Sequence, residues 1–231
     1  MQISVVQYMW GDSSYFRYSQ AINRYYCDLH GYRYHLSQEF PRMDRHINWH
    51  KIDVMERFLA ECGEDYVLFL DADAHFYAMS LTIENELAAK LNSSDERKDI
   101  LLAEDLLCES SRYAPGHPNS GIIFMRVNDF TRQFYHQWNA TSDKHAEWRF
   151  KWEYAGNRLA DQAALVHELY PQHRKRIFMT KEYYIMNAVY GQYIRHYAGF
   201  DNNYRAAQMQ DYMQRYLPEV YSQLHGDEEN S

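Results

Sequence analysis

Apolar positions in the N-terminal third of the chain change between the spacing of a strand and the spacing of a helix. Residues 2–7 form a short apolar run that predicts a buried first strand. Apolar side chains then recur at helical spacing from Tyr18 to Leu29, and Gly31 predicts the end of that helix. Residues 32–36 alternate again as a second strand would. This β-α-β unit predicts two parallel strands side by side.

The alternation of strands and helices continues to the end of the chain. A second helix begins near Asn48, carries Trp49 and Leu59 among its apolar positions, and ends at Cys62 and Gly63. The whole pattern predicts an α/β fold with a mostly parallel, Rossmann-like sheet flanked by helices and a C-terminal helical segment. The other predicted strands are 66–70, 100–103, 121–127, 176–180 and 193–197, and the other predicted helices are 81–91, 129–138, 157–169 and 203–224.

The composition indicates a soluble globular protein. Hydrophobic residues make up 46% of the 231 positions, with only 9 glycines and 5 prolines, so the chain can build a core. The formal net charge of -8 argues against nucleic acid as a partner. No apolar run is long enough to span a bilayer, and the 3 cysteines lack disulfide or zinc-site spacing. We expect a cytoplasmic protein, unless the chain is a domain excised from a membrane-anchored parent.

The stretch YVLFLDADAHF places two carboxylates directly after an apolar predicted strand. Side chains two residues apart in an extended segment point to the same side, so Asp71 and Asp73 would face one spot, with His75 in phase if the extension continues. In α/β sheets this strand end is where ligands bind. Two such anions repel each other unless a cation lies between them, which favours a divalent ion carried on a diphosphate. The structural alternative is an Asp pair that caps the next turn or helix.

Five stretches resemble, in the expected order, motifs of nucleotide-sugar-dependent glycosyltransferases with the GT-A fold. FLDADAHF resembles their Asp-x-Asp motif. NWHKIDVMERFL resembles the Trp-x-Lys helix of the galactosyl- and xylosyltransferase family that acts on plant xyloglucan and fungal mannans. PNSGIIFMR resembles its Asn-x-Gly strand, LADQAALVHEL its Asp-Gln-x-Ala-Leu helix start and IRHYAGF its late His-x-x-Gly element. We expect a GT-A domain over 1–200, a helical extension packed on it over 201–225 and a frayed tail over 226–231.

The resemblance implies a metal-dependent glycosyltransferase. Asp71, Asp73 and His196 would bind Mn²⁺, or Mg²⁺, which bridges the diphosphate of a nucleotide-sugar donor, with UDP favoured over GDP. The ion would offset the negative charge that the leaving nucleoside diphosphate gains. Gly199 would let the backbone come close to the phosphates. His75 is then expected to be a core or supporting residue and not a ligand.

Other residues would hold the donor. Lys51 would reach the diphosphate or the nucleotide, with a solvated helix lysine as the equal alternative. Gln7 and Tyr8, at the end of the first predicted strand, would hold the base, with Tyr8 stacking on it. The donor sugar would be lined by Asn119, Ser120 and Gly121.

The stereochemistry of transfer depends on Asp161 and Gln162. In retaining relatives a residue of this helix lies near the anomeric carbon, opposite the leaving group. Gln162 would stabilise positive charge there and Asp161 would hold donor or acceptor hydroxyls. The resemblance favours retaining transfer of a hexose or pentose to a hydroxyl of a glycan or another acceptor. An inverting enzyme would need a carboxylate base, for which the candidates are Glu104, Asp105 and Asp161.

Two other interpretations compete with this one. Phosphatases and phosphotransferases of the haloacid dehalogenase type also place Asp-x-Asp after a strand, but near the N-terminus and followed by Thr or Val, where this chain has His75. A non-catalytic carbohydrate-binding or nucleotide-sugar-binding module would fit the 22 tyrosines, whose rings suit sugar or base stacking, although ordinary packing accounts for most of them. The sequence predicts neither the acceptor nor the oligomeric state.

Overall fold

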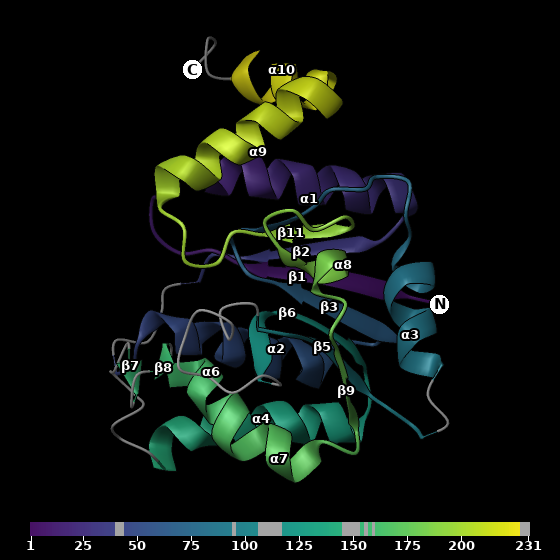
Figure 1. Ribbon diagram of the computed structural model, residues 1–231, viewed down its shortest axis with the longest axis vertical. Coiled ribbons are helices and arrows are strands. Elements are labelled where there is room, and N and C mark those ends of the chain that lie inside the picture. Colours follow the sequence, from purple (N-terminus) through teal and green to yellow (C-terminus); the bar gives the residue numbers. More distant parts are fainter. Residues whose placement is uncertain are drawn as a thin grey trace.

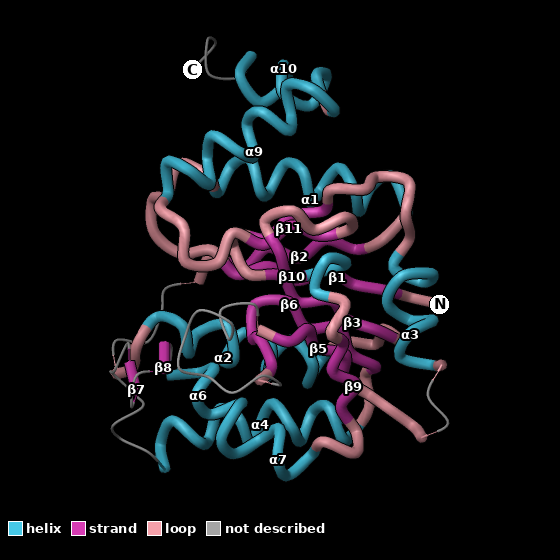
Figure 2. The backbone as a smooth tube through the Cα atoms, in the orientation of Figure 1, coloured by secondary structure: helices cyan, strands magenta, loops and turns pink. Residues whose placement is uncertain are grey.

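A central six-stranded sheet organises the protein in the computed structural model, which describes residues 1–39, 44–93, 96–105, 117–144, 153–154, 157–158 and 160–226 (Figures 1 and 2). Its strands are Ile3–Tyr8 (β1), Arg33–Ser37 (β2), Tyr66–Leu70 (β3), Ile100–Glu104 (β5), Pro118–Arg126 (β6) and Ile177–Thr180 (β9). They lie in the order β2-β1-β3-β6-β5-β9. β1 is parallel to β2 and β3, and β5 is parallel to β9, whereas β6 is antiparallel to both of its neighbours. The mostly parallel α/β sheet predicted from the sequence is confirmed.

The reversed strand β6 fixes the position of the candidate site. Because β6 runs against β3, its first residues lie beside the carboxyl end of β3, and Leu70 pairs with Ile122. The backbone N–H of Asp71 donates to the carbonyl of Gly121 at 2.7 Å. The Asn-x-Gly segment and the Asp-x-Asp segment, which are far apart in the sequence, are therefore neighbours in the sheet.

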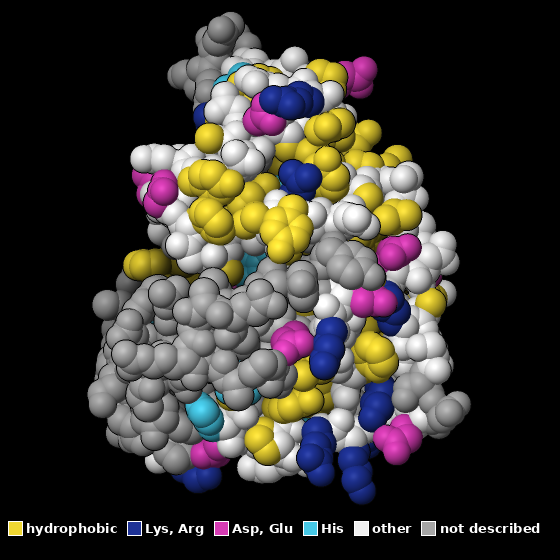
Figure 3. Space-filling model, in the orientation of Figure 1, with side chains coloured by type: hydrophobic (Ala, Val, Ile, Leu, Met, Phe, Trp, Pro, Cys, Tyr) yellow, Lys and Arg dark blue, Asp and Glu magenta, His cyan; other side chains and the backbone are white. Residues whose placement is uncertain are grey.

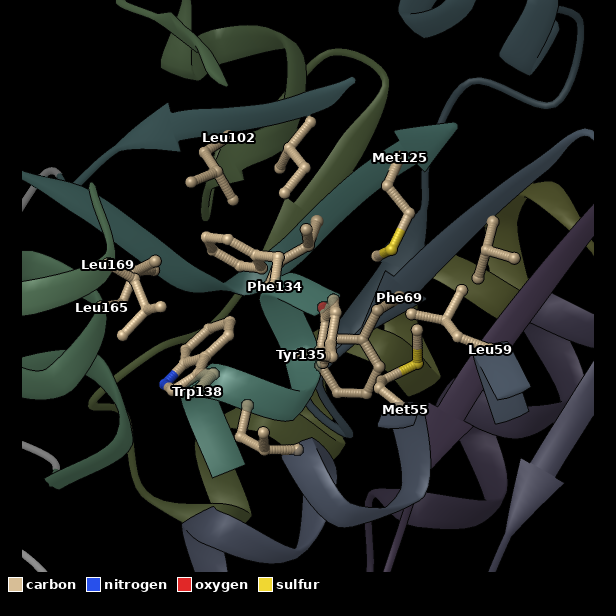
Figure 4. Close-up of a cluster of buried hydrophobic side chains, with 14 of the residues drawn as sticks. Met55, Leu59, Phe69, Leu102, Met125, Phe134, Tyr135, Trp138, Leu165 and Leu169 are labelled. Carbon is tan, nitrogen blue, oxygen red and sulfur yellow. The ribbon is translucent and has the colours of Figure 1, made fainter. Parts of the chain in front are cut away.

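Helices cover both faces of the sheet (Figure 1). α1 (Phe16–His30) lies on one face and ends at Gly31, which has a φ of 72° and confirms the predicted helix stop. α2 (His50–Glu61) and α4 (Asp129–Lys144) pack on the other face, where Phe69, Tyr135 and Trp138 belong to one apolar cluster (Figure 4). The shorter helical elements are Ile47–Trp49, Glu84–Ala88, Ala89–Asn92 (α3), Ala160–Ala164 (α6), Leu165–Leu169, Tyr170–His173 (α7) and Tyr183–Met186 (α8).

The C-terminal segment forms two helices and not the single helix predicted over 203–224. α9 (Asn202–Tyr216) is separated from α10 (Pro218–Gly226) because Pro218 has no backbone N–H to continue α9. Both helices pack against α1 around a cluster that includes Met209 and Met213. Residues 227–231 of the predicted frayed tail lie outside the described residues. In the part of the chain described here, none of the helices combines the length and the apolarity that a bilayer crossing requires.

A small second sheet brings a late segment of the chain to the end of β3. It contains β4 (Ala74–Phe76), β10 (Asn187–Ala188) and β11 (Ile194–His196), and His196 lies opposite Ala74. The extension that would keep His75 in phase with the two acids does not continue, because the Ala74 N–H donates to the Asp71 carbonyl and closes a turn. A separate two-stranded ribbon pairs Glu153–Tyr154 (β7) with Asn157–Arg158 (β8), so the helix predicted from 157 starts only at Ala160.

Candidate active site

Three candidate metal ligands from two distant segments converge beyond the carboxyl end of β3. Asp71 and Asp73 follow β3, and His196 is the last residue of β11. One ligand atom from each lies within 4.8 Å of the other two. His196 Nε2 is 3.2 Å from Asp73 Oδ1 and 3.9 Å from Asp71 Oδ2. Carboxylate oxygens with one imidazole nitrogen suit Mn²⁺ and also accommodate Mg²⁺, so the donor set fits the ion predicted from the sequence.

Backbone hydrogen bonds and one buried amide hold the turn that carries the two acids. The Tyr197 N–H donates to the carbonyl of Asp73 at 3.1 Å. The side-chain amide of Gln7 donates to the carbonyls of Asp71 at 3.1 Å and Ala74 at 3.2 Å. Gln7 is fully buried, so its contacts here support the metal turn. Direct contact between Gln7 and a nucleotide base stays an untested prediction.

Each acid of the cluster is paired with its own protein cation. Lys51 Nζ, from α2, is 3.2 Å from Asp71 Oδ1, and Arg205 Nη2, from α9, is 2.9 Å from Asp73 Oδ2. Lys51 and Arg205 therefore offset the repulsion between the two acids, in addition to any ion that binds between them. Asp73 Oδ1 is left facing His196 Nε2 at 3.2 Å. Contacts within the protein are therefore enough to hold the three candidate ligands together.

The contacts of the cluster move three pKa values in different ways. Burial acts to raise the pKa of Asp73, but His196 and Arg205 outweigh it and lower the value to about 2. Burial raises the pKa of Asp71, where Lys51 offsets part of the effect and the charge of Asp73 adds to it. Burial acts to lower the pKa of His196, but Asp73 raises it above the ordinary value. A proton on His196 has to leave before its Nε2 can bind a metal.

A hydrogen-bond relay orients the imidazole of His196. Its Nδ1 is 2.7 Å from the side-chain oxygen of Asn187, and the Asn187 amide nitrogen donates to the Glu104 carbonyl at 3.1 Å. The second bond fixes the amide so that its oxygen faces His196, which makes Nδ1 the donor and turns Nε2 toward the two acids. Partners of this kind tune metal ligands in proteins. Asn187 was not among the residues predicted from the sequence.

Lys51 connects the metal cluster to a second buried polar group. Its Nζ is 3.1 Å from Asp161 Oδ2 and donates to the carbonyl and the hydroxyl of Ser120, both at 3.2 Å. Burial acts to lower the pKa of Lys51, but Asp161 and Asp71 raise it above the ordinary value. The alternative of a solvated helix lysine is wrong, because the side chain is buried. Contact between Lys51 and a diphosphate stays a prediction.

The residues predicted to act on the sugar lie together around Ser120. Gln162 Nε2 donates to Asp105 Oδ2 at 2.6 Å, and Gln162 Oε1 accepts from the Ser120 hydroxyl at 3.3 Å. The same hydroxyl is 3.1 Å from Asp161 Oδ2. Asp161 is fully buried, and within the described part of the chain its Oδ1 has no hydrogen-bond partner. A buried carboxylate oxygen without a partner is able to accept a hydrogen bond from a ligand hydroxyl.

Gly121 lies where no side chain fits. A Cβ built on it would be 2.8 Å from both Asp71 Oδ2 and His196 Nε2, and closer still to His196 Cε1. The Gly121 N–H donates to the side-chain oxygen of Asn119 at 2.8 Å, which orders the start of β6. The glycine is therefore needed for the close approach of β6 to the metal cluster.

The remaining predicted residues occupy supporting or peripheral positions. The hydroxyl of Tyr8, at the end of β1, donates to the carbonyl of Glu39 at 3.4 Å. Burial raises the pKa of this hydroxyl to about 12. Gly199 has a φ of 80°, a conformation that favours glycine. His75 is fully buried, and its Nδ1 bonds the carbonyl of Phe76, which confirms the expectation of a core residue. Base stacking by Tyr8 and phosphate contact at Gly199 stay predictions.

Arg205 is a site residue that the sequence did not reveal. Besides Asp73 Oδ2, its guanidinium donates to the carbonyl of Tyr197 at 3.2 Å and to the hydroxyl of Tyr15 at 3.3 Å. These contacts hold one oxygen of Asp73 away from the cluster and leave the other for a metal. The segment that supplies Arg205 matched no motif, so only the packing of α9 on α1 brings it to the site.

We expect Arg205→Ala to weaken Mn²⁺ binding in the presence of UDP about 10- to 100-fold, the usual effect of losing a residue that orients a metal ligand. Isothermal titration calorimetry measures this directly. Arg215→Ala is the matched control, because Arg215 lies on the same helix and pairs with Asp211 on the exposed surface at 2.7 Å. Unchanged or tighter Mn²⁺ binding in Arg205→Ala would contradict the positioning role.

Comparison with known proteins identifies the family. A family model described as nucleotide-diphospho-sugar transferase matches residues 13–228. The chain belongs to this family. The matched region contains the metal cluster and the polar network from Lys51 to Arg205. A search of curated proteins found no significant match to this transferase.

Solved structures show the same fold. A glycosyltransferase involved in the glycosylation of the major capsid of PBCV-1 has a TM-score of 0.70 at 14% identity, covering 91% of this chain and 100% of that one. The galactosyltransferase LgtC in complex with donor and acceptor sugar analogs has a TM-score of 0.51 at 12% identity, covering 90% of this chain and 95% of that one. The glycosyltransferase GlyE of Streptococcus pneumoniae TIGR4 has a TM-score of 0.50 at 10% identity, covering 96% of this chain and 64% of that one.

These findings confirm the GT-A fold and the assignment of the chain to the transferase enzymes. The haloacid dehalogenase interpretation is wrong, because the family match and the fold both differ from it.

Proposed function

We propose that this transferase moves a hexose or pentose from a nucleoside diphosphate sugar, with UDP as the nucleotide, to a hydroxyl of a glycan or another acceptor, with retention of configuration. The observation that carries the proposal is the Asp71–Asp73–His196 cluster beside the buried pair Asp161 and Gln162, with Lys51 bonded to both groups. A place suited to a divalent ion and a diphosphate thus adjoins polar atoms suited to a sugar.

The cluster supports the binding of the donor diphosphate. Asp71, Asp73 and His196 would hold Mn²⁺ or Mg²⁺, which when bound stabilises negative charge on the leaving diphosphate without a proton transfer. Lys51 and Arg205 add two positive charges beside the same carboxylates. Both charges are balanced within the protein by these acids, so a bound divalent ion would supply the positive charge that attracts a diphosphate.

The surroundings of Asp161 favour retention over inversion. Asp161 is fully buried and its Oδ2 is engaged by Lys51 and Ser120, which makes it a poor base for an acceptor that arrives from solvent. Its Oδ1 has no hydrogen-bond partner within the described residues, so it would accept a hydrogen bond from a donor-sugar hydroxyl only where the bound donor reaches it. Gln162 is neutral, and its carbonyl oxygen, which accepts from Ser120, would stabilise positive charge at a nearby anomeric carbon without taking a proton. The competing inverting mechanism would use Asp105, whose Oδ2 accepts from Gln162.

Thermal unfolding with UDP, GDP and dTDP, each with Mn²⁺ or with EDTA, tests the proposal. A ligand at 100 times its Kd stabilises the folded state by about 2.7 kcal/mol. We expect UDP with Mn²⁺ to raise the Tm by roughly 5–10 °C in a chain of this size, and the other combinations to raise it less. A Tm that no nucleotide moves in a metal-dependent way would contradict the proposed donor. Proton NMR of the sugar released from UDP-glucose and UDP-galactose then distinguishes retention from inversion. The α-anomer that appears before mutarotation indicates retention, and the β-anomer indicates inversion.

A further inference from the structure

An exposed pair of aromatic rings lies at the start of α9. Phe200 is 40% exposed and Tyr204 is 37% exposed. Their rings are stacked, with centroids 4.7 Å apart and 20° between the ring planes. Figure 3 shows hydrophobic side chains gathered over α9 on this face of the molecule. Contiguous exposed apolar side chains on a globular protein mark a candidate binding surface.

The aromatic pair is connected to the metal cluster by two direct neighbours. The ring of Tyr204 is 6.2 Å from the ring of Tyr197, whose N–H donates to the carbonyl of Asp73. Arg205, next to Tyr204 in the chain, contacts the Asp73 carboxylate itself. The pair therefore belongs to the same packed unit as Asp73, to which it is linked through Tyr197 and Arg205.

The two sides of the cluster differ in exposure and in chemistry. On the side of α6, Asp161 and Gln162 are buried and polar, which suits a donor sugar that has to be shielded from water. On the side of α9, Phe200 and Tyr204 are aromatic and open. An acceptor that continues into a longer glycan has to leave the site through an open side, so the aromatic side suits the acceptor.

We propose that Phe200 and Tyr204 form an acceptor platform on which a sugar ring of a neutral glycan stacks. The C–H face of a pyranose matches a flat aromatic ring, and the Tyr204 hydroxyl supplies a polar edge. The neighbouring charges are engaged within the protein: Asp201 accepts from the Tyr204 N–H at 2.9 Å, and Arg205 is paired with Asp73. The platform therefore favours a neutral sugar over an ionic group. This inference rests on the proposed glycosyl transfer.

Binding of lactose, cellobiose, maltose and methyl glucoside, measured by saturation-transfer NMR and titration with UDP and Mn²⁺ present, tests the platform. We expect the native protein to bind at least one of these sugars, and Phe200→Ala and Tyr204→Ala each to weaken its binding about tenfold. Phe200→Tyr keeps an aromatic face and should keep the affinity. Tyr216→Ala is the matched control, because Tyr216 is a 58% exposed aromatic residue at the far end of α9.

The results separate failure of the platform from failure of the proposed function. Absence of binding for all four sugars, or equal binding by the native protein and both alanine variants, would overturn the platform while Mn²⁺-dependent UDP binding persists. Weaker UDP binding in Phe200→Ala with unchanged sugar binding would assign the rings to the nucleotide base and also overturn it. If the native protein binds no nucleotide with Mn²⁺ yet loses sugar affinity on Phe200→Ala, the proposed donor is wrong and the platform stands.

Discussion

Asp73→Asn is expected to abolish metal-dependent activity and to lower the free energy of unfolding, whereas Asp71→Asn should abolish the activity alone. Each substitution replaces a carboxylate ligand by a neutral amide, which is a weak ligand for a divalent ion. The loss of a ligand from a three-residue cluster should reduce activity at least about 100-fold. The two acids nevertheless differ in what they contribute to the folded protein without metal.

The difference in stability follows from the different surroundings of the two acids. The pKa of Asp73 is lowered to about 2, so folding favours its ionised form. This stabilisation is present above the pKa of the unfolded chain and is lost as the pH falls through about 2. Asparagine leaves Arg205 and His196 without that charge, and the pKa shift corresponds to a cost of about 2–3 kcal/mol. Burial raises the pKa of Asp71, and Lys51 keeps Asp161 as a partner, so Asp71→Asn should change stability by less than about 1 kcal/mol.

Urea denaturation in EDTA and calorimetric Mn²⁺ titration measure the two effects separately. The stability gap between the native protein and Asp73→Asn should narrow as the pH is lowered toward 2, because protonated Asp73 then resembles asparagine. Equal destabilisation by the two substitutions would contradict the assignment of Arg205 and His196 as partners of Asp73. Native-like Mn²⁺ affinity in either variant would contradict the ligand assignment.

Patterns that depend on near neighbours were predictable from the sequence. Strand 66–70 has its predicted bounds, and Gly31 ends the first helix as expected, because hydrophobic runs and caps are local features. The C-terminal segment shows how a local rule can be overlooked. Pro218 is visible in the sequence and forbids a continuous helix, yet the segment 203–224 is predicted as a single helix rich in Gln and Tyr.

Only the site residues that lie within recognisable sequence motifs were predictable. Asp71, Asp73 and His196 lie in segments that resemble family motifs, and the structure brings them together. Asn187 and Arg205 have no such signal, because their roles arise from the pairing of β10 with β11 and the packing of α9 on α1. The burial of Lys51 was equally hidden, since a helix pattern does not show which acids a neighbouring strand and helix will place against it.

Gly121→Ala is expected to disable the metal cluster while leaving most of the fold intact. The added Cβ would meet Asp71 Oδ2 and His196 Nε2 at 2.8 Å, and His196 Cε1 at a shorter distance. Neither neighbour can retreat freely, because Lys51 pairs with Asp71 and Asn187 bonds His196 Nδ1. The methyl group therefore has to displace a ligand or push β6 away from β3. Overpacking of this kind costs about 1–3 kcal/mol of stability.

Mn²⁺ affinity and UDP-sugar turnover should each fall at least about 100-fold in Gly121→Ala, since displacement of a ligand by even 1 Å has an effect of that size. Gly63→Ala is the matched control, because a Cβ there meets nothing within 4 Å and should leave both quantities unchanged. Far-UV circular dichroism and urea denaturation establish that Gly121→Ala is folded under the assay conditions. A folded Gly121→Ala variant with Mn²⁺ affinity within about threefold of the native value would show that β6 does not approach the cluster as closely as described. The same result would mean that lack of space beside Asp71 and His196 does not explain why position 121 is a glycine.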